Sequence, residues 1–443
     1  MELSIEQKII FDKYINKENI FITGPGGSGK SALIKTIYNH AININKNIQV
    51  CALTGCAAIL LNCKAKTIHS WSGIGLGNGS IENILKKIEK NIFKKKVWKQ
   101  VDILIIDEVS MLSLHLFDLL NHIGQFIRKS NKPFGGIQII FSGDFYQLPP
   151  IINKDKDDFN DLSIQFCFES KNWNNVFKKE NQIQLIQIFR QTDQIYVNIL
   201  NQIRQGIIKR KSVDLLLKYV GKIIDPLLIT KPTKLFPIRN KVDFINNYEM
   251  SLLPNEEKVF ESKYNLDNEI TKEEQILRSQ YNQKEIQTEL DFMSNNIDKN
   301  IKLKVGAQIM CIINTECNGY QLCNGSQGII TRFCESTGLP FIKFNAGFEI
   351  KMNKHIWLSD NIPGIGISQL PLILAWALTI HKSQGATMDV AEIDVGNNIF
   401  ECGQTYVALS RVKSLDGLYL TSFDVSKIKI NKKVKEYYES LSF

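Results

Sequence analysis

The sequence has few features that staple small folds, hold metals or direct a chain to a membrane. Its nine cysteines are an odd number in 443 residues and form no CxxC pair, which argues against a disulfide framework or a zinc cage. The regular spacing of Cys311, Cys317 and Cys323 matches no metal motif. The longest apolar stretch, 370–380, contains a proline and is too short to span a membrane, and the amino-terminal run MELSIEQKII resembles neither a signal nor a transit peptide. We therefore expect free thiols and a soluble intracellular protein, nuclear or cytoplasmic (or in a viral factory), with no membrane partner.

The excess of positive over negative charge is also small. Lysine and arginine total 54 and aspartate and glutamate 45, so the net charge is +9. This excess permits a polyanionic partner without indicating one. Hydrophobic residues at 44% and charged residues at 22% are typical of folded globular proteins, which excludes the disordered and fibrous classes. The length favours about three domains.

Apolar runs and helical patterns alternate along the first 150 residues. The runs at 20–22, 49–53, 103–106 and 137–141 are candidate strands, and stretches with helical spacing of apolar residues lie between them. Buried apolar strands separated by helices are typical of a parallel sheet that is covered on both faces. The first third of the chain is therefore predicted to be an α/β domain.

The second half contains a different pattern. Residues 255–300 are polar and are interpreted as exposed helix or connection, whereas 303–348 consist of short apolar runs with glycine turns, the pattern of a small β-barrel. The strand and helix alternation returns after residue 370. The simplest organisation is two α/β domains, the second interrupted by a small β insertion.

Lysines gather at 86–99 and again at 427–435. Such runs are compatible with nucleic-acid contact, but a solvated helix face is the favoured interpretation.

A glycine-rich run follows the first candidate strand. Residues 24–31 have the sequence GPGGSGKS, which fits G-x-x-x-x-G-K-[ST] between a strand and a helix. The glycines allow successive backbone N–H groups to surround a β-phosphate, and the helix start adds a positive dipole. Lys30 can neutralise the β- and γ-phosphate oxygens, and the Ser31 hydroxyl can bind Mg²⁺. The run predicts nucleoside triphosphate binding.

An acidic pair ends the candidate strand at 103–106. Asp107 can contribute to the coordination shell of Mg²⁺ beside the phosphates. Glu108 can act as the general base for the attacking water. A strand followed by two acidic residues is a weak signal alone, but after a P-loop it is the expected second half of an ATPase site.

The run GDFYQLPP at 143–150 follows the candidate strand at 137–141. Gln147 could sense the nucleotide state through its amide, or the run could be an ordinary turn from strand to loop; the residues alone leave both interpretations open. Phe145 and Tyr146 could stack on a base, although core packing is favoured.

These segments resemble the petite-integration-frequency (Pif-type) DNA helicases, which belong to the 5′-to-3′ branch of helicase superfamily 1 and are relatives of the RecD-like enzymes. The run at 143–150 separates this branch from other superfamily 1 enzymes. The resemblance covers nearly the whole chain in collinear order and begins with a Q-motif-like start at Glu6 and Gln7. The other matching segments are 54–58 (TGCAA), 67–70 (TIHS), 106–111 (IDEVSM), 133–138 (PFGGIQ), 189–191 (FRQ), 306–310 (GAQIM), 324–328 (NGSQG), 380–385 (IHKSQG) and 406–411 (YVALSR).

The resemblance implies an α/β fold class: two tandem RecA-like P-loop NTPase domains, with a small wedge insertion in the first and a small Src-homology-like β-barrel insertion in the second. It implies a first core domain at 1–61 and 80–183, a wedge at 62–79, a second core domain at 184–257 and 367–443, and a helical connection with the barrel at 258–366.

The resemblance also implies residue roles. The residues implied to catalyse hydrolysis are Lys30, Asp107, Glu108, Gln147, and Arg190 and Arg411 as arginine fingers. Those implied to bind ATP are Gln7 at the adenine, Gly24, Pro25, Gly26, Gly27, Ser28, Gly29, Lys30, Ser31, Ala32, Gln384 and Gly385, with Ser31 and Asp107 as Mg²⁺ ligands. Those implied to contact DNA are Thr54, Thr67, His69, Ser70, His381 and Ser383.

The implied function is an ATP-dependent DNA helicase that moves 5′ to 3′ along single-stranded DNA and unwinds duplex DNA. Its expected cofactors are ATP and Mg²⁺. Its expected partners are single-stranded DNA and tailed or forked duplex DNA, and we expect a monomer when active. The alternative is a DNA-stimulated P-loop ATPase that acts as a translocase or remodelling factor without separating strands.

Overall fold

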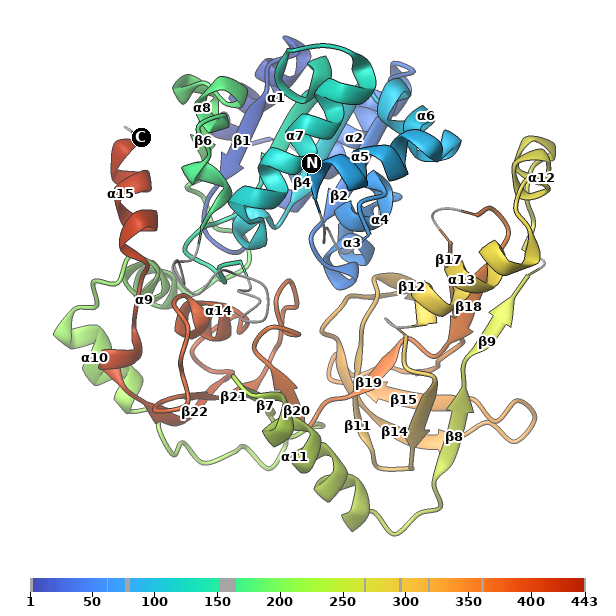
Figure 1. Ribbon diagram of the computed structural model, residues 1–443. Helices are drawn as coiled ribbons and strands as arrows, with labels where there is room; N and C mark the ends of the chain where they lie inside the picture. Colours follow the sequence, from blue (N-terminus) through green and yellow to red (C-terminus); the bar gives the residue numbers. More distant parts are fainter. Residues whose placement is uncertain are drawn as a thin grey trace. The chain divides into compact units, whose positions relative to one another are not determined.

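The computed structural model describes residues 3–61, 63–75, 80–150, 165–266, 268–294, 297–317, 319–359 and 362–441 (Figure 1). Part of the predicted wedge, residues 62 and 76–79, lies outside this description. The chain divides into two compact units. Unit 1 comprises Met1–Leu217, Val395–Leu415 and Phe423–Phe443, and unit 2 comprises Lys218–Asp394 and Asp416–Ser422.

Unit 1 is built on a parallel six-stranded sheet with the order β3-β2-β4-β5-β1-β6. The four strands predicted from the apolar runs are all present, and no end differs from the predicted one by more than one residue. The strands are β1 (Ile20–Thr23), β2 (Ile48–Ala52), β3 (Lys66–Thr67), β4 (Ile103–Asp107), β5 (Gln138–Ser142) and β6 (Gln182–Gln184).

The two faces of this sheet follow from alternation along each strand. In β1, Ile20 and Ile22 point into one apolar layer while Phe21 points into the other. The layer on the Ile20 side includes residues of α1, α2 and α3, and the layer on the Phe21 side includes residues of α4 to α8 and α15. Both faces are therefore covered, as expected for buried parallel strands.

Several helices of unit 1 begin at a side-chain cap. In α1, the Ser4 hydroxyl accepts from the Gln7 amide N–H, and the Gln7 side chain accepts from the Ser4 N–H. The helices are α1 (Ile5–Ile15), α2 (Lys30–Asn43), α3 (Gly55–Leu61), α4 (Ile68–Ser72), α5 (Ile81–Lys90), α6 (Ile92–Gln100), α7 (Leu114–Arg128), α8 (Trp173–Val176), α9 (Gln194–Arg204), α10 (Arg210–Leu217), α14 (Gln404–Leu409) and α15 (Lys432–Ser440), with short 3₁₀ turns at Val109–Met111, Pro133–Gly136, Cys167–Glu169, Lys179–Asn181 and Val425–Lys427.

Unit 2 contains a four-stranded sheet and a larger set of antiparallel strands. The four-stranded sheet has the order β20-β7-β21-β22, and a five-stranded antiparallel sheet has the order β16-β15-β14-β11-β19. Short sheets join β10 with β8, β12 with β13, and β17 with β18 and β9. The prediction of β strands in 303–348 is confirmed, and the described residues of the polar stretch 255–300 hold two helices and two short strands, with a third strand beginning at residue 300.

The elements of unit 2 are β7 (Thr233–Phe236), α11 (Arg239–Leu252), β8 (Lys258–Glu261), β9 (Lys263–Asn265), α12 (Lys272–Arg278), α13 (Gln283–Ser294), β10 (Asn300–Leu303), β11 (Gln308–Cys311), β12 (Thr315–Cys317), β13 (Tyr320–Leu322), β14 (Gln327–Phe333), β15 (Pro340–Phe344), β16 (Glu349–Lys351), β17 (His355–Leu358), β18 (Gly366–Gln369), β19 (Leu372–Leu374), β20 (Ala377–Thr379), β21 (Ala391–Val395) and β22 (Leu418–Phe423).

The compact units do not coincide with the predicted domains. Residues 184–217, 395–415 and 423–443, expected in the second core domain, lie in unit 1. The compact units are groups of residues that contact one another, whereas the predicted domains follow the expected continuity of each sheet. The domain boundaries therefore stay a prediction.

Among the described residues, no helix is both long and apolar enough to cross a membrane.

A tight contact between α7 and the turn at Pro133–Gly136 provides a test of this packing. A Cβ on Gly124 would lie 2.6 Å from the Phe134 carbonyl oxygen, so Gly124→Ala must displace backbone. We expect this substitution to reduce the free energy of unfolding by about 1–3 kcal/mol through overpacking. Thermal unfolding followed by circular dichroism measures the effect.

Gly55→Ala is the matched control, because Gly55 lies at the start of α3 and no atom comes within 4 Å of the position that the alanine Cβ would take. Equal melting temperatures for the two variants would contradict the packing described for Gly124.

Candidate nucleotide site

Three strand ends meet at one edge of the unit 1 sheet. β4, β5 and β1 are neighbours in the strand order and run in the same direction, so their carboxyl ends lie side by side. The glycine-rich loop follows β1, Asp107 ends β4, and Gly143 and Asp144 follow β5. Crevices at the carboxyl ends of parallel strands are the usual ligand sites of such sheets.

The loop at 24–29 leads directly into α2, whose first residue is Lys30. Gly29 has φ +85° and caps the helix in the left-handed region, which costs least for glycine. A Cβ on Gly29 would lie 2.8 Å from the Gln7 amide nitrogen, so the glycine also leaves room for Gln7. Gln7, predicted to read adenine, therefore lies beside the loop.

Lys30 bends back over this loop. Its ammonium donates to the carbonyl oxygens of Gly24 at 2.6 Å and Pro25 at 3.0 Å. Burial lowers the pKa of Lys30, and the carboxylates of Asp144, Glu108 and then Asp107 oppose that shift. Lys30 thus lies between the loop carbonyls and nearby carboxylates.

The acidic pair occupies two different environments. Asp107 is buried, and burial followed by repulsion from Glu108 raises the pKa of its carboxyl to about 6. The Glu108 backbone and the positive charge of Lys30 oppose the shift. Glu108 has φ +56° and ψ +40°, a left-handed conformation that is unfavourable for a residue with a long side chain. Backbone strain of this kind is concentrated at functional sites.

Two arginines and a tyrosine converge on Gly26. A Cβ on Gly26 would lie 3.6 Å from a guanidinium nitrogen of Arg190, 3.6 Å from one of Arg411, and 3.7 Å from the Tyr406 hydroxyl. The Gly26 N–H donates to the Tyr406 hydroxyl at 2.9 Å. The structure therefore brings together three groups that are at least 160 residues away from the loop in sequence.

Arg411 is almost fully buried at 2% exposure. Its guanidinium donates to the Val407 carbonyl at 2.8 Å and to the Ser410 hydroxyl at 2.7 Å. Burial, and then the like charge of Arg190, lower the pKa of Arg411 to about 9, while Glu108 opposes the shift. Two cations held this close favour an anion between them, as a polyphosphate chain would provide.

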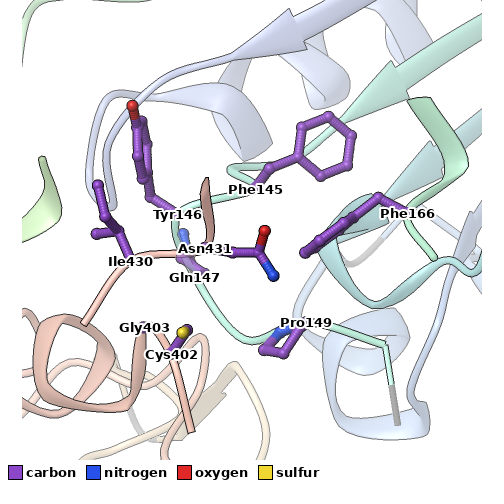
Figure 2. Close-up of a pocket in the computed structure, with 9 residues that line it drawn as sticks. All are labelled: Phe145, Tyr146, Gln147, Pro149, Phe166, Cys402, Gly403, Ile430 and Asn431. Carbon is purple, nitrogen blue, oxygen red and sulfur yellow. The ribbon is translucent and has the colours of Figure 1, made fainter. Parts of the chain in front are cut away.

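Gln147 is buried and borders a small cavity shown in Figure 2. The cavity measures about 10 Å³, near the lower limit for one water molecule, so it cannot hold a nucleotide. Phe145 points toward Phe166, away from Tyr146 (Figure 2), and is 2% exposed, which confirms core packing for this ring. The sensing role of Gln147 stays a prediction.

Tyr406, Asp144 and Arg204 are the site residues that sequence reasoning missed. Tyr406 is the first residue of the segment 406–411, in which a role was predicted only for Arg411. Asp144 lies in the run at 143–150 and accepts two hydrogen bonds from Arg204, each 2.8 Å long. Arg204 belongs to none of the quoted motifs, so only the structure reveals it.

Ser31 and Asp107 are suited to Mg²⁺ by chemistry, one hydroxyl and one carboxylate beside the loop. The described residues contain no cluster of three or more histidine, cysteine or acidic side chains that could hold a metal. Mg²⁺ bound with a nucleotide commonly takes one or two protein ligands and completes its shell with phosphates and water, so the two residues fit this ion.

The sequence also matches known proteins. Residues 2–214 match the family described as PIF1-like helicase, and residues 292–333 match the 2B domain of DNA helicase Pif1. ATP-dependent DNA helicase RRM3 of Saccharomyces cerevisiae is 31% identical over 519 residues, an alignment that covers 99% of this chain and 68% of that protein.

This chain belongs to the PIF1-like helicase family. The predicted resemblance is therefore confirmed. The chain spans about two thirds of the length of the curated relatives that it matches.

Solved structures of PIF1-like helicases share the fold. The Pif1 helicase from Candida albicans is 33% identical with a TM-score of 0.77, and the match covers 100% of both chains. The Pif1 helicase from Bacteroides crystallised with ADP-AlF3 and single-stranded DNA is 28% identical with a TM-score of 0.65, covering 99% of this chain and 97% of that chain. The predicted fold class of two tandem RecA-like domains with a small β insertion is confirmed.

The residues that the PIF1-like resemblance assigns to DNA lie in both units. Thr54 and Thr67 accept backbone hydrogen bonds at the starts of α3 and α4, and burial lowers the pKa of His69. In unit 2, His381 is exposed, whereas the buried Ser383 hydroxyl donates to the Ile380 carbonyl at 2.8 Å. Ser70 is partly exposed on α4. Their DNA contacts stay predictions.

Gln384 and Gly385 follow β20 in unit 2, where Gly385 has φ +82°. Their predicted contact with ATP stays a prediction.

The lysine run at 86–99 lies on α5 and α6. These helices carry seven lysines and two glutamates, a surplus of five positive charges out of nine for the whole chain. Ile84, Leu85 and Ile88 bury one face of α5, so Lys86 and Lys90 lie on the solvent face. The interpretation as a solvated face is compatible with this placement. Lys94 is different, since its ammonium donates to the Ser70 carbonyl at 2.6 Å.

The burial of Arg411 beside Arg190 has a measurable consequence for stability. Replacing a buried charge by an apolar residue of similar size is often neutral or stabilising. We expect Arg411→Met to keep or raise the melting temperature without nucleotide, and to reduce the stabilisation that a non-hydrolysable ATP analogue provides. Differential scanning fluorimetry measures both quantities.

The control is Arg239→Met, whose side chain is 77% exposed and pairs with Asp243 at 3.4 Å. We expect that change to have little effect on either quantity. A marked loss of stability in Arg411→Met without nucleotide would contradict the charge balance described here.

Proposed function

We propose that this chain is an ATP-dependent DNA helicase that hydrolyses ATP, moves 5′ to 3′ along single-stranded DNA and unwinds duplex DNA as a monomer. The observation that carries this proposal is the convergence of Arg190 and Arg411 on Gly26, beside the Lys30 ammonium. A P-loop alone supports nucleotide binding. Two added guanidiniums at the phosphate position are suited to the charge that develops during phosphoryl transfer.

The residues around the loop divide the chemistry between them. Lys30 and the backbone N–H groups of 26–30 hold the phosphates of ATP, and Gln7 lies where it can contact the adenine. Glu108 accepts a proton from the attacking water as general base. Arg190 and Arg411 stabilise the negative charge of the transition state. Mg²⁺, held by Ser31 and Asp107, supplies charge neutralisation at the phosphates.

DNA as the partner is supported by the Bacteroides relative, whose crystals contain single-stranded DNA. In this chain, the residues proposed to lie along the strand are Thr54, Thr67, His69, Ser70, His381 and Ser383. Contacts to the phosphate backbone dominate sequence-independent binding, so affinity should fall as salt concentration rises.

Unwinding of tailed duplexes tests the proposal directly. We expect ATPase activity to rise with added single-stranded DNA, and a duplex with a 5′ single-stranded tail to be separated in the presence of ATP. A duplex with only a 3′ tail should stay intact. Gel analysis of labelled strands and a phosphate-release assay measure the two activities.

Each other outcome has a distinct meaning. Unwinding of the 3′-tailed substrate alone would overturn the polarity. Strong DNA-stimulated hydrolysis with no separated strands would favour the alternative, a translocase or remodelling ATPase. Hydrolysis that single-stranded DNA does not affect would contradict both.

Lys30→Ala tests the assignment of the phosphate site. Removal of the ammonium should reduce kcat for ATP hydrolysis at least about a hundredfold, because charge stabilisation at the transferred phosphoryl group is lost. Lys35→Ala, on the same helix α2, is the control and should retain turnover. Retained hydrolysis in Lys30→Ala would show that the site lies elsewhere.

A further inference from the structure

The carboxyl-terminal helix α15 places one hydroxyl group between two segments of the nucleotide site. The Tyr438 hydroxyl lies 2.6 Å from the Thr23 hydroxyl and accepts from the Phe145 N–H at 3.1 Å. Thr23 is the last residue of β1, directly before the P-loop, and Phe145 lies two residues before Gln147. One side chain from the end of the chain therefore joins the P-loop strand to the segment that carries Gln147.

The ring of Tyr438 holds the same segment from a second direction. It stacks on Tyr146 with centroids 4.7 Å apart and planes 11° apart. The Arg204 guanidinium lies 4.6 Å from the Tyr146 centroid and 5.5 Å from that of Tyr438. Arg204 is bound by both oxygens of Asp144, so the residues 144–146 are fixed by an ion pair, a ring stack and a hydrogen bond.

The opposite side of the segment contacts α14. Gly403, with φ +79°, caps α14, and a Cβ there would lie 2.5 Å from the Gln147 carbonyl oxygen and 2.7 Å from that of Tyr146. Arg411 follows α14, and Tyr406 lies within it. A shift of Gln147 would therefore press on the helix that leads to Arg411, unless the segment 144–147 is held in place.

We propose that Tyr438 is a positioning residue for ATP hydrolysis, because its hydroxyl holds the segment 144–147 in register with the P-loop. The inference rests on the proposed ATPase function. Tyr438 does not touch the phosphates; it acts through Thr23 on one side and through Phe145 and Gln147 on the other. The polar link is not needed to attach α15, since Val434 and Leu441 are buried beside it.

Tyr438 remains protonated over the working range of the protein, since burial raises the pKa of its hydroxyl. The group can therefore both accept from the Phe145 N–H and share a proton with the Thr23 hydroxyl. Phenylalanine at this position would retain the ring stack and lose the bridge, together with the 3.5 Å hydrogen bond that the Tyr438 hydroxyl donates to Asp144 Oδ1.

Tyr438→Phe tests the inference, and Tyr437→Phe is the matched control. The Tyr437 hydroxyl donates to the Gln182 side-chain oxygen at 2.5 Å and accepts from the Trp173 indole N–H at 3.2 Å, so it makes a comparable bond away from the P-loop. We expect Tyr438→Phe to lower kcat for DNA-stimulated ATP hydrolysis about tenfold or more, as small misplacements in a catalytic site do, and to leave KM for ATP nearly unchanged. Tyr437→Phe should leave both unchanged.

A second readout separates positioning from stability. ADP with aluminium fluoride mimics the transferred phosphoryl group, whereas ADP alone does not. We expect Tyr438→Phe to reduce the rise in melting temperature caused by ADP with aluminium fluoride and to preserve the rise caused by ADP. A structural role alone would change the baseline melting temperature and leave this difference intact.

A double-mutant cycle with Thr23→Val completes the test. If the two hydroxyls act as one link, the double variant should lose no more activity than the worse single variant. Wild-type kcat in Tyr438→Phe, equal losses in Tyr438→Phe and Tyr437→Phe, or effects of Tyr438→Phe and Thr23→Val that simply add would each overturn the inference. An inactive wild-type chain would contradict the proposed function itself. An active wild-type chain with any of the results above would contradict only the positioning role of Tyr438.

Discussion

The ion pair between Asp144 and Arg204 is the interaction on which the nucleotide edge of unit 1 depends. Both side chains are buried, at 0% and 4% exposure, and burial of two charges carries a large desolvation cost. Two parallel hydrogen bonds and two flanking tyrosine rings compensate that cost. Burial opposes the charge of Arg204, but Asp144 outweighs burial and raises the pKa of the guanidinium. Loss of one partner would leave the other charge uncompensated, at about 3–5 kcal/mol.

The ion pair is important because it holds the segment 144–147 in place, and this segment contacts several other parts of the site. Residues 144–147 follow β5. Their Phe145 N–H donates to the Tyr438 hydroxyl, which links the segment to the P-loop strand, and two of their carbonyl oxygens lie against Gly403 at the start of α14. Because this segment is held rigidly, the reactive groups at the sheet edge need not rearrange when the substrate binds. The strained backbone of Glu108 and the closely spaced cations Arg190 and Arg411 are unfavourable features of the same edge. Sites that bind a polyanion commonly carry such local costs, and the surrounding fold offsets them.

The distribution of charge is more informative than its sum. A net charge of +9 is modest for a protein that binds nucleic acid, and five of those charges lie on α5 and α6. The cations of the nucleotide site are instead balanced locally by Asp107, Glu108 and Asp144. The charge at the phosphate site therefore depends on how these cations and carboxylates are placed, and the net charge of the whole chain does not reveal it.

Local patterns in the sequence predicted the P-loop, the acidic pair and four of the six strands of unit 1, because each depends on neighbouring residues: apolar alternation, a glycine turn, or a strand end. The family resemblance added Arg190 and Arg411, which carry no local signal. Contacts such as Thr23 with Tyr438, 415 residues apart, and Asp144 with Arg204, 60 residues apart, were not predicted. A hydrogen bond between distant residues depends on how the helices pack on the sheet, and no spacing rule records that packing. The sequence by itself thus determined which groups could perform the chemistry, and only the tertiary structure decided which side chains hold those groups in place.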